Sequence, residues 1–184
     1  MKIIKGKDFL YSNTCVTIGK FDGVHVGHRH ILNELHKISV HDSLTSVVLT
    51  FDYSYFNDNK KNRLNSYEEK LKLLEEFGTD IMIDYPFDDE TRNLSAENFI
   101  RFVLLKRLGV KSIVVGENFK FGKGAEGTVQ TLKYFGGIFG YDTLVIPCIE
   151  FEGETVSSTR IREEINLGNI ERADRMLGKN SMDL

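Results

Sequence analysis

Two histidines, His25 and His28, stand three residues apart in the run GKFDGVHVGHRHIL, where an apolar stretch gives way to a helical pattern. Gly27 lies between them, and glycine lets a backbone turn tightly and approach a ligand closely. The first turn of a helix has unpaired N–H groups and the positive end of the helix dipole, which favour an anion. The spacing is therefore typical of a phosphate-binding turn, in which protonated imidazoles would donate charge-assisted hydrogen bonds to phosphate oxygens.

A site of this kind needs no nucleophilic side chain. Phosphoryl or nucleotidyl transfer can proceed through positioning of the reactants and stabilisation of the charge that develops on phosphate oxygens. Two other interpretations of the two histidines remain open, a structural turn and two ligands of a zinc site. No further cluster of histidine, cysteine or carboxylate residues accompanies them, so the sequence assigns no metal ligands. His30, His36 and His41 lack a comparable context and are expected at the surface.

A second glycine-rich stretch, GENFKFGKGAEG, follows an apolar run. Asn118 can donate and accept hydrogen bonds, and Phe119 and Phe121 can enclose a planar ring. The competing interpretation is an ordinary glycine loop whose aromatic side chains pack into the core.

A third stretch, VSSTRIR, carries hydroxyl groups at the start of a predicted helix. Ser157 or Ser158 is expected to cap that helix. Arg162 lies one helical turn beyond Ser158, on the same face, and could bind a phosphate through two hydrogen bonds. A plain capped helix with solvated arginines is the alternative.

Short apolar runs alternate with runs of helical period, which predicts an α/β fold: a Rossmann-like, doubly wound parallel sheet of about five strands with flanking helices and a small C-terminal helical appendage. The expected strands are 14–19, 46–51, 80–85, 112–116 and 143–149. The expected helices are 28–40, 66–77, 95–108 and 129–139, with two short helices after residue 157 that separate at Gly168. Ligands of such sheets bind beyond the carboxyl ends of the strands, so the turns after the first, second and fourth strands are expected to face one crevice.

The totals fit one domain over residues 1–184. A formal net charge of −3 argues against nucleic-acid binding through bulk electrostatics. The sequence contains no run of the roughly 18 apolar residues that a membrane span requires, and its start lacks a signal-peptide pattern, which predicts a cytoplasmic protein without a membrane partner. Cys15 and Cys148 lie in apolar, strand-like runs and are expected to be buried, inert thiols.

Together these stretches resemble, in order and spacing, the FMN adenylyltransferase (FAD synthetase) module of the bacterial bifunctional riboflavin kinase/FAD synthetases, within the nucleotidylyltransferase superfamily. The motifs that carry the resemblance are GKFDGVHVGHRHIL, GENFKFGKGAEGT and VSSTRIREEINLGNIERADRMLG, and LTF, SYEEKLKLLEEFGTD and LSAENFIRFVLLKRLGVKSIVVG fit between them. The similarity extends from about Val16 to Gly178. The two histidines alone would indicate only the wider superfamily.

The resemblance implies an enzyme that joins FMN to the AMP part of ATP, with Mg²⁺, to give FAD and pyrophosphate. It implies that His25 and His28 contact the ATP phosphates, that His28 stabilises charge in the transition state, and that Arg162 assists. The nucleotide-binding residues that it implies are Gly19, Phe21, Asp22, Gly23, Gly27, Ser158 and Thr159. The implied flavin-binding or substrate-binding residues are Phe51, Asp52, Asn118, Phe119 and Phe121.

Two departures from the family pattern matter. After Thr50–Phe51 the family continues with an acidic residue and Pro-His-Pro, whereas this chain has Asp52 followed by Tyr53, Ser54 and Tyr55. The tyrosines could stack on a flavin, but the changed loop puts substrate orientation or rate in question. The second departure is length, since the family's riboflavin kinase barrel follows where this sequence ends; we expect no riboflavin phosphorylation by this chain.

Two alternatives to FMN adenylyl transfer remain open at this point. One is nucleotidyl transfer to another acceptor, such as nicotinamide mononucleotide or phosphopantetheine. The other is a flavin-binding or nucleotide-binding regulatory module with weak catalysis, which the changed loop would explain. Mg²⁺ ligands and oligomeric state do not follow from the sequence, although Asp22 and Asp52 are available to a metal.

Overall fold

The computed structural model describes residues 1–52 and 63–179. Its centre is a parallel six-stranded sheet with the strand order β1-β4-β3-β2-β5-β6. The strands are β1 (Lys2–Lys5), β2 (Thr14–Ile18), β3 (Thr45–Asp52), β4 (Ile81–Pro86), β5 (Val110–Gly116) and β6 (Asp142–Ile146). All five residues of β2 are buried, as expected for a central strand covered on both faces.

The strand order reverses beside β2. The chain runs outward from β2 through β3 to β4, and then crosses back to place β5 on the other side of β2. In doubly wound sheets this reversal leaves a crevice at the carboxyl ends of the two neighbouring strands, where ligands bind. The turns after β2 and β5 therefore lie at the topological switch point.

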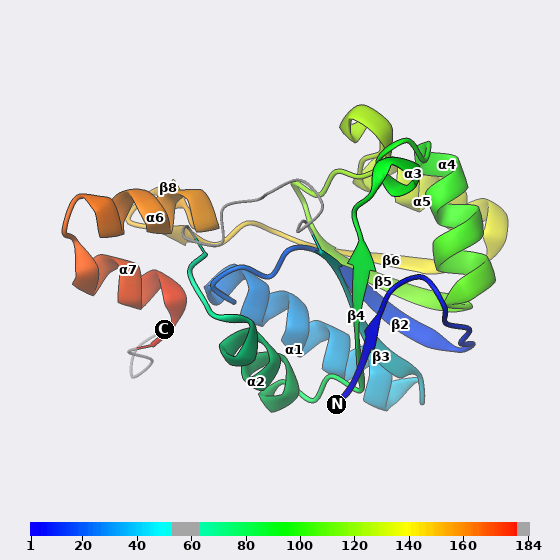
Figure 1. Ribbon diagram of the computed structural model, residues 1–184, viewed down its shortest axis with the longest axis horizontal. Coiled ribbons are helices and arrows are strands. Elements are labelled where there is room, and N and C mark those ends of the chain that lie inside the picture. Colours follow the sequence, from blue (N-terminus) through cyan, green and yellow to red (C-terminus); the bar gives the residue numbers. More distant parts are fainter. Residues whose placement is uncertain (53–62, 180–184) are drawn as a thin grey trace.

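Helices cover both faces of the sheet (Figure 1). On one face, α1 (Val26–His41) and α2 (Tyr67–Glu76) pack into a cluster that includes Leu32, Leu35 and Leu74. On the other face lie α3 (Asp89–Arg92), α4 (Ala96–Asn98), the π-helix η3 (Phe99–Arg107) and α5 (Val129–Phe139). The core of that face includes Ile100 and Leu132. The two apolar clusters hold the sheet between two helical layers.

Local sequence signals begin and end several of these helices. Ser66 and Glu69 form a reciprocal capping box at the start of α2. Thr128 accepts a hydrogen bond from the Thr131 N–H at the start of α5, and Gly140 ends that helix in a left-handed conformation at φ 75°. These caps satisfy backbone groups that the helices cannot pair internally.

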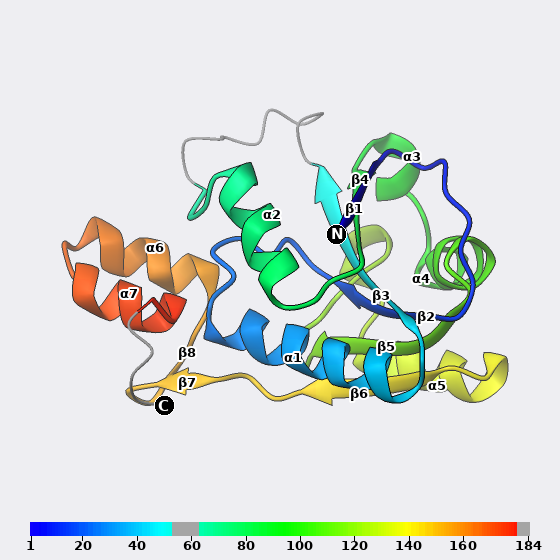
Figure 2. The same ribbon diagram turned by 90° about the horizontal axis from the view of Figure 1, so that it is seen from below.

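Residues 150–177, here called the C-terminal unit, form a separate small layer beside the sheet (Figure 2). A two-stranded hairpin, β7 (Glu150–Phe151) and β8 (Glu154–Thr155), leads into α6 (Ser158–Asn166) and α7 (Ile170–Leu177). Its core consists of Val156, Ile161, Ala173, Met176 and Leu177. Val26 of α1 and Leu64 pack against this core, which attaches the C-terminal unit to the start of α1.

The structure confirms the predicted Rossmann-like α/β class and adds an edge strand. The sequence analysis did not predict β1, because Lys2–Lys5 offers only two apolar residues and pairs with β4 alone. The predicted strand 143–149 ends early, at Ile146, since Pro147 lacks the N–H group that a strand interior requires. The helix predicted from His28 begins two residues earlier, at Val26.

One prediction about the cysteines was wrong. Cys15 is fully buried, and burial raises the pKa of its thiol to about 11, as expected for an inert thiol. Cys148 instead follows the end of β6, is half-buried and accepts a hydrogen bond from Asn118. Tyr53–Phe56, the part of the changed loop beyond Asp52, lies outside the described residues.

Candidate functional site

The turn between β2 and α1 has a tightly constrained backbone. Phe21, Gly23 and Val24 adopt positive φ values of 50°, 86° and 39°. Such conformations are uncommon for residues other than glycine, and those that persist are held by the surrounding structure. Phe21 and Val24 are both buried, and Arg29 Nε donates to the Val24 carbonyl. Packing therefore fixes the path of this turn in front of α1.

The two histidines at the end of the turn lie face to face. The rings of His25 and His28 stack with centroids 3.7 Å apart and planes 21° apart, and the Phe21 ring lies 5.0 Å from that of His28. Nδ1 of each histidine is buried and has no hydrogen-bond partner within the part of the chain that the structure describes. An unpaired buried polar atom costs free energy, which a hydrogen bond to a ligand can recover.

Gly27 leaves room for this stacked pair. A Cβ atom at Gly27 would lie 3.3 Å from two atoms of the His25 ring, closer than ordinary van der Waals contact. His25 occupies the N-cap position of α1, but its side chain caps no backbone N–H group. The start of this 16-residue helix thus lacks a side-chain cap, and its free N–H groups and dipole favour an anion.

Burial keeps both imidazoles neutral. It lowers the pKa of His25 to about 4, although the nearby Asp22 acts in the opposite direction. Burial also lowers the pKa of His28 well below its usual value, and the neighbouring His25 adds to this effect. His28 is partly exposed as a residue, but Phe21 and His25 enclose its ring. Burial therefore opposes the protonated imidazoles that phosphate binding is expected to favour.

Asp22 connects this turn to two distant segments. Its Oδ1 accepts from the Leu64 N–H at 2.9 Å, and its Oδ2 pairs with Arg162. Its main-chain carbonyl accepts from Ser158 Oγ at 2.8 Å. The start of α6 therefore lies against the turn that carries the histidines.

The hydroxyl groups at the start of α6 have different roles. Ser157, the N-cap, accepts a hydrogen bond from the Arg160 N–H, so it is the cap among the two candidates. Ser158 is the first helical residue and directs its hydroxyl to Asp22. Thr159 is exposed. The predicted phosphate ligands Ser158 and Arg162 thus contact the turn directly.

The predicted flavin-binding aromatic residues form a second group. Ring contacts run from Phe51 through Phe99 to Phe121, with centroid separations of 6.5 and 5.8 Å. Phe119 stacks on Phe121 at 5.5 Å. These residues belong to the apolar cluster on the face of the sheet opposite α1, whereas Phe21 belongs to the cluster beneath α1. The structure therefore brings the predicted residues together as two groups at the carboxyl end of the sheet.

The loop after β5 is held in place by hydrogen bonds. Phe121 and Gly127 exchange two backbone hydrogen bonds across a short 3-10 turn, η4 (Lys123–Ala125). Glu126 accepts from the Ala96 N–H at the start of α4. Asn118, near the start of the loop, is exposed and donates to Cys148 Sγ at 3.0 Å. A fixed loop can present Asn118 and the Phe119 ring in a defined orientation.

The sequence analysis did not identify Leu64 and Arg29 as supports of the site. Leu64 donates to Asp22 and packs close to Gly23, where a Cβ atom would lie 2.8 Å from Leu64 Cδ1. Arg29 follows His28 directly and holds the Val24 carbonyl. Residue type marks neither of them, because Leu64 acts through its main-chain N–H, which folding brings to Asp22, and Arg29 bonds to a main-chain carbonyl.

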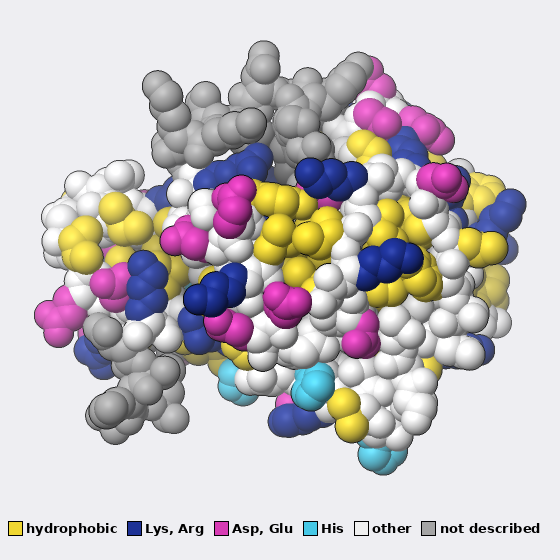
Figure 3. Space-filling model, turned by 60° about the horizontal axis from the view of Figure 1, so that its bottom comes forward, with side chains coloured by type: hydrophobic (Ala, Val, Ile, Leu, Met, Phe, Trp, Pro, Cys, Tyr) yellow, Lys and Arg dark blue, Asp and Glu magenta, His cyan; other side chains and the backbone are white. Residues whose placement is uncertain are grey.

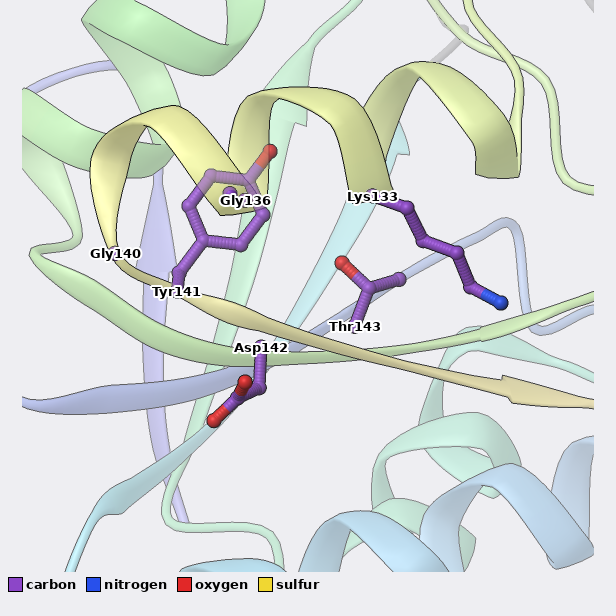
Figure 4. A pocket seen from close by; sticks show the side chains of 7 residues that line it. Lys133, Gly136, Gly140, Tyr141, Asp142 and Thr143 are labelled. Carbon is purple, nitrogen blue, oxygen red and sulfur yellow. The ribbon is translucent and has the colours of Figure 1, made fainter.

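Two other surface features do not belong to this site. Figure 3, in which the side of α1 and α2 comes forward, shows histidine side chains at the surface, and His30, His36 and His41 are exposed as predicted. A shallow pocket of about 300 Å³ lies between α5 and the start of β6, lined by Lys133 and Thr143 among others (Figure 4). The pocket lies at the amino end of the sheet. The turn between β2 and α1 that carries His25 and His28, here called the histidine turn, follows the carboxyl end of β2.

The described residues contain no group of three or more histidine, cysteine or acidic residues that could hold a metal ion. Both carboxylate oxygens of Asp22 already have partners. Asp52 is the last residue of β3. Across residues 1–52 and 63–179, no helix combines the length and apolar character needed to cross a membrane.

Comparison with known proteins identifies relatives over nearly the whole chain. The bifunctional riboflavin kinase/FMN adenylyltransferase of Buchnera aphidicola subsp. Schizaphis graminum (strain Sg) is 33% identical over 187 residues, which cover 97% of this chain and 60% of that protein. The protein of the same name from Escherichia coli (strain K12) is 36% identical over 186 residues, covering 97% of this chain and 59% of the relative. The chain therefore spans about 60% of the length of these curated relatives.

A solved structure described as a macrolide-efflux protein from Streptococcus pneumoniae superposes with a TM-score of 0.84 at 28% identity, covering 97% of this chain and 60% of that one. This similarity supports the fold over the whole chain. The family model described as FAD synthetase matches residues 9–160, which include the histidine turn, the loop after β5 and the start of α6. The chain belongs to the FAD synthetase family.

Proposed function

We propose that the chain is an FMN adenylyltransferase, which transfers AMP from ATP to FMN and releases pyrophosphate. The observation that carries this proposal is the convergence of the stacked His25 and His28, the uncapped start of α1 and the start of α6 at one switch point. This combination suits a triphosphate, since it offers hydrogen-bond donors from two sides and the Arg162 cation from one of them. Family membership favours FMN as the acceptor and FAD as the product.

The reaction is a direct displacement at phosphorus. An oxygen of the FMN phosphate attacks the α-phosphorus of ATP, and a new P–O bond forms. The bond from the α-phosphorus to the oxygen that bridges to the β-phosphate breaks, and pyrophosphate leaves with that electron pair. The protein contributes by aligning the two phosphates and by stabilising negative charge as it develops.

His25 and His28 supply donors on the α1 side of the triphosphate. A neutral imidazole carries one N–H group, so each ring donates one hydrogen bond without becoming charged. The negative charge of a bound triphosphate also favours the protonated form and raises the pKa of both rings from the low values of the free protein. His28 is the residue to which we assign stabilisation of the transition state.

The start of α6 supplies donors on the other side. In this proposal Thr159 and Arg162 bind the triphosphate through their side chains, and Arg162 is the single positive one. Ser158 donates its hydroxyl proton to the Asp22 carbonyl and binds the triphosphate through its main-chain N–H at the start of the helix. Arg162 has five N–H donors in a planar group, so it can keep its contact with Asp22 and still bind a phosphate oxygen. Gly19, Phe21, Gly23 and Gly27 form the backbone of the nucleotide-binding turn.

The flavin lies, in this proposal, on the side of the loop after β5. The Phe119 ring offers an aromatic surface that the buried Phe121 supports from behind, and Asn118 offers its carbonyl oxygen and an N–H not used by Cys148. Phe51 and Asp52 end the neighbouring strand β3. An isoalloxazine ring can stack on such a surface while its polar edge bonds to the amide. The acceptor would then reach the α-phosphorus from the carboxyl ends of β3 and β5.

Mg²⁺ enters this reaction with ATP. The donor set in the described residues lacks a carboxylate cluster, and Mg²⁺ in phosphoryl-transfer sites is commonly bound by phosphates and water with few protein ligands. Such an ion neutralises charge on the transferring and leaving phosphates. This arrangement fits a metal carried by the nucleotide rather than one held permanently by the protein.

The test is a turnover assay with FMN, ATP and Mg²⁺ in which FAD and pyrophosphate are followed by chromatography. Equal amounts of the two products are expected, and replacement of FMN by nicotinamide mononucleotide should abolish product formation. A chain that binds FMN and ATP but forms no FAD would instead be a binding module. Turnover with the other acceptor but not with FMN would assign a different nucleotidyl transfer.

A further inference from the structure

Three segments that are far apart in the sequence meet at Asp22. The Leu64 N–H lies 2.9 Å from Oδ1, Ser158 Oγ lies 2.8 Å from the main-chain carbonyl, and the Arg162 guanidinium pairs with Oδ2. The side chain of Asp22 is 16% exposed. Asp22 thus orients Ser158 and Arg162, two of the three residues of α6 that the proposed function assigns to the triphosphate.

The charge of Asp22 is unexpected at a site for an anion. A carboxylate near a bound triphosphate repels it, most strongly where the site is shielded from water. A direct contact between Asp22 and phosphate would therefore weaken binding. The pairing with Arg162 indicates another role for this carboxylate. It holds the flexible, cationic Arg162 side chain in a fixed direction before the substrate binds.

The backbone around Asp22 supports this use. Phe21 and Gly23 on either side have positive φ values, and Leu64 packs close to Gly23. These constraints direct the Asp22 carbonyl and carboxylate to the same side, toward α6. Because the surrounding backbone fixes the position of Asp22, Asp22 can fix the position of the first helical turn of α6.

We propose that Asp22 is a positioning residue, which acts through Ser158 and Arg162 to align the start of α6 with the histidine turn, and that it contacts neither the nucleotide nor a metal ion. This inference rests on the proposed function, since Ser158 and Arg162 are taken to bind the triphosphate. It replaces the nucleotide-binding role that the sequence analysis gave to Asp22. Asp22 therefore sets how well a bound triphosphate is aligned.

The variant that isolates this role is Asp22→Asn. An asparagine Oδ1 can still accept from the Leu64 N–H, and the main-chain carbonyl remains for Ser158, so the contacts of Asp22 lose only the ion pair with Arg162, together with the negative charge that faces His25. We expect kcat/KM for ATP to fall about 10- to 100-fold, while KM for FMN stays within about twofold. Simple removal of a repulsive charge would change kcat/KM for ATP in the opposite direction, so an unchanged or higher value would overturn the proposal.

Glu152→Gln is the matched control. It removes a carboxylate from another ion pair of the C-terminal unit, the one with Arg172, and does not touch the turn. This variant should leave kcat/KM for ATP within about twofold of the parent. A loss as large as that of Asp22→Asn would mean that any weakening of the C-terminal unit lowers activity, and the specific role of Asp22 would be rejected.

A double-mutant cycle with Arg162→Gln tests whether Asp22 acts through the arginine. If it does, Asp22→Asn should change kcat/KM by no more than about twofold in the Arg162→Gln background. Losses that multiply independently would contradict the proposal. Melting temperatures of all variants, measured alongside, separate these effects from unfolding.

A readout without turnover distinguishes failure of this inference from failure of the proposed function. Hydrogen exchange of the α6 amides should be faster in Asp22→Asn than in the parent, and unchanged in Glu152→Gln. If the parent makes no FAD but α6 responds in this way, the proposed function fails and the positioning role stands. Unchanged exchange together with normal FAD formation would leave the function intact and remove the role of Asp22.

Discussion

The residues around the stacked histidines determine whether their rings carry a proton charge. Phe21 and the constrained turn exclude water from the two rings, and burial keeps both neutral in the unliganded protein. The rings lie at the uncapped start of α1 with their Nδ1 atoms unpaired. A negatively charged ligand at this position changes the electrostatic environment of both rings at once, which suits a site that must respond to charge on a phosphate.

Replacement of His28 by alanine should lower the rate of FAD formation by about 10²- to 10³-fold, since loss of one donor to a developing negative charge typically has this effect. The measurement is kcat with saturating FMN and ATP. His30→Ala is the control, because His30 is exposed on the same helix. Equal rates for the two variants would remove His28 from the transition state.

Gly27→Ala should lower activity without loss of stability. The new Cβ lies 3.3 Å from the His25 ring and displaces it, so we expect about a tenfold fall in kcat/KM for ATP. In a helix, alanine is favoured over glycine by up to about 1 kcal/mol, so the urea midpoint should not fall. Gly137→Ala in α5 has no atom within 4 Å of its new Cβ and should keep full activity. A fall in both variants would contradict displacement of the ring as the cause.

Among the elements, α6 depends on its first turn for both stability and placement. Ser157 caps the helix, and the next residue, Ser158, joins it to the histidine turn. At the other end, Asn169 Nδ2 donates to the buried Glu164, which also faces Arg160 and Arg172. The helix is therefore held between a polar cluster near α7 and the polar contacts around Asp22.

Ser157→Ala should destabilise the protein by about 1 kcal/mol, the usual contribution of an N-cap hydrogen bond. The measurement is the free energy of unfolding in urea. Ser157→Asn should retain most of the stability, because asparagine is also a good cap. If asparagine and alanine were equally destabilising, the loss would have a cause other than the cap.

At the scale of the whole molecule, the parallel sheet separates two apolar clusters and leaves the histidine turn and the aromatic group on opposite faces of one edge. Reversal of the strand order between β2 and β5 opens that edge. The C-terminal unit then covers one side of it through α6 (Figure 1). Because the neutral histidines lie within this assembly, proton binding by His25 is linked to folding of the entire domain.

Folding stability should fall as the pH is lowered from about 6.5 toward 4. The pKa of His25 is about 4 in the folded protein and near 6.5 in an unfolded chain, so the unfolded state binds more protons in this window. Complete protonation would remove on the order of 3 kcal/mol of stability. Urea midpoints across this pH range, compared between the parent and His25→Gln, measure the effect. Identical slopes for the two proteins would show that His25 does not contribute.

Much of the fold could be predicted from the sequence, because local patterns report directly on local structure. The capping box at Ser66, the helix over 129–139 and the two short C-terminal helices correspond to the elements observed. Strand β1 could not be predicted, since Lys2–Lys5 becomes a strand only by pairing with β4, more than 70 residues away. The burial of Cys148 was predicted wrongly because an apolar run does not reveal where its strand ends.

The sequence by itself determined which side chains are available to the site, their chemistry, and the family to which the chain belongs. Only the tertiary structure decided their state and their partners. The neutrality of His25 and His28 arises from burial between segments, and the contacts of Asp22 with Leu64, Ser158 and Arg162 span 42 to 140 positions of the chain. Long-range burial and pairing of this kind depend on how the layers pack, and a local sequence pattern does not encode that packing.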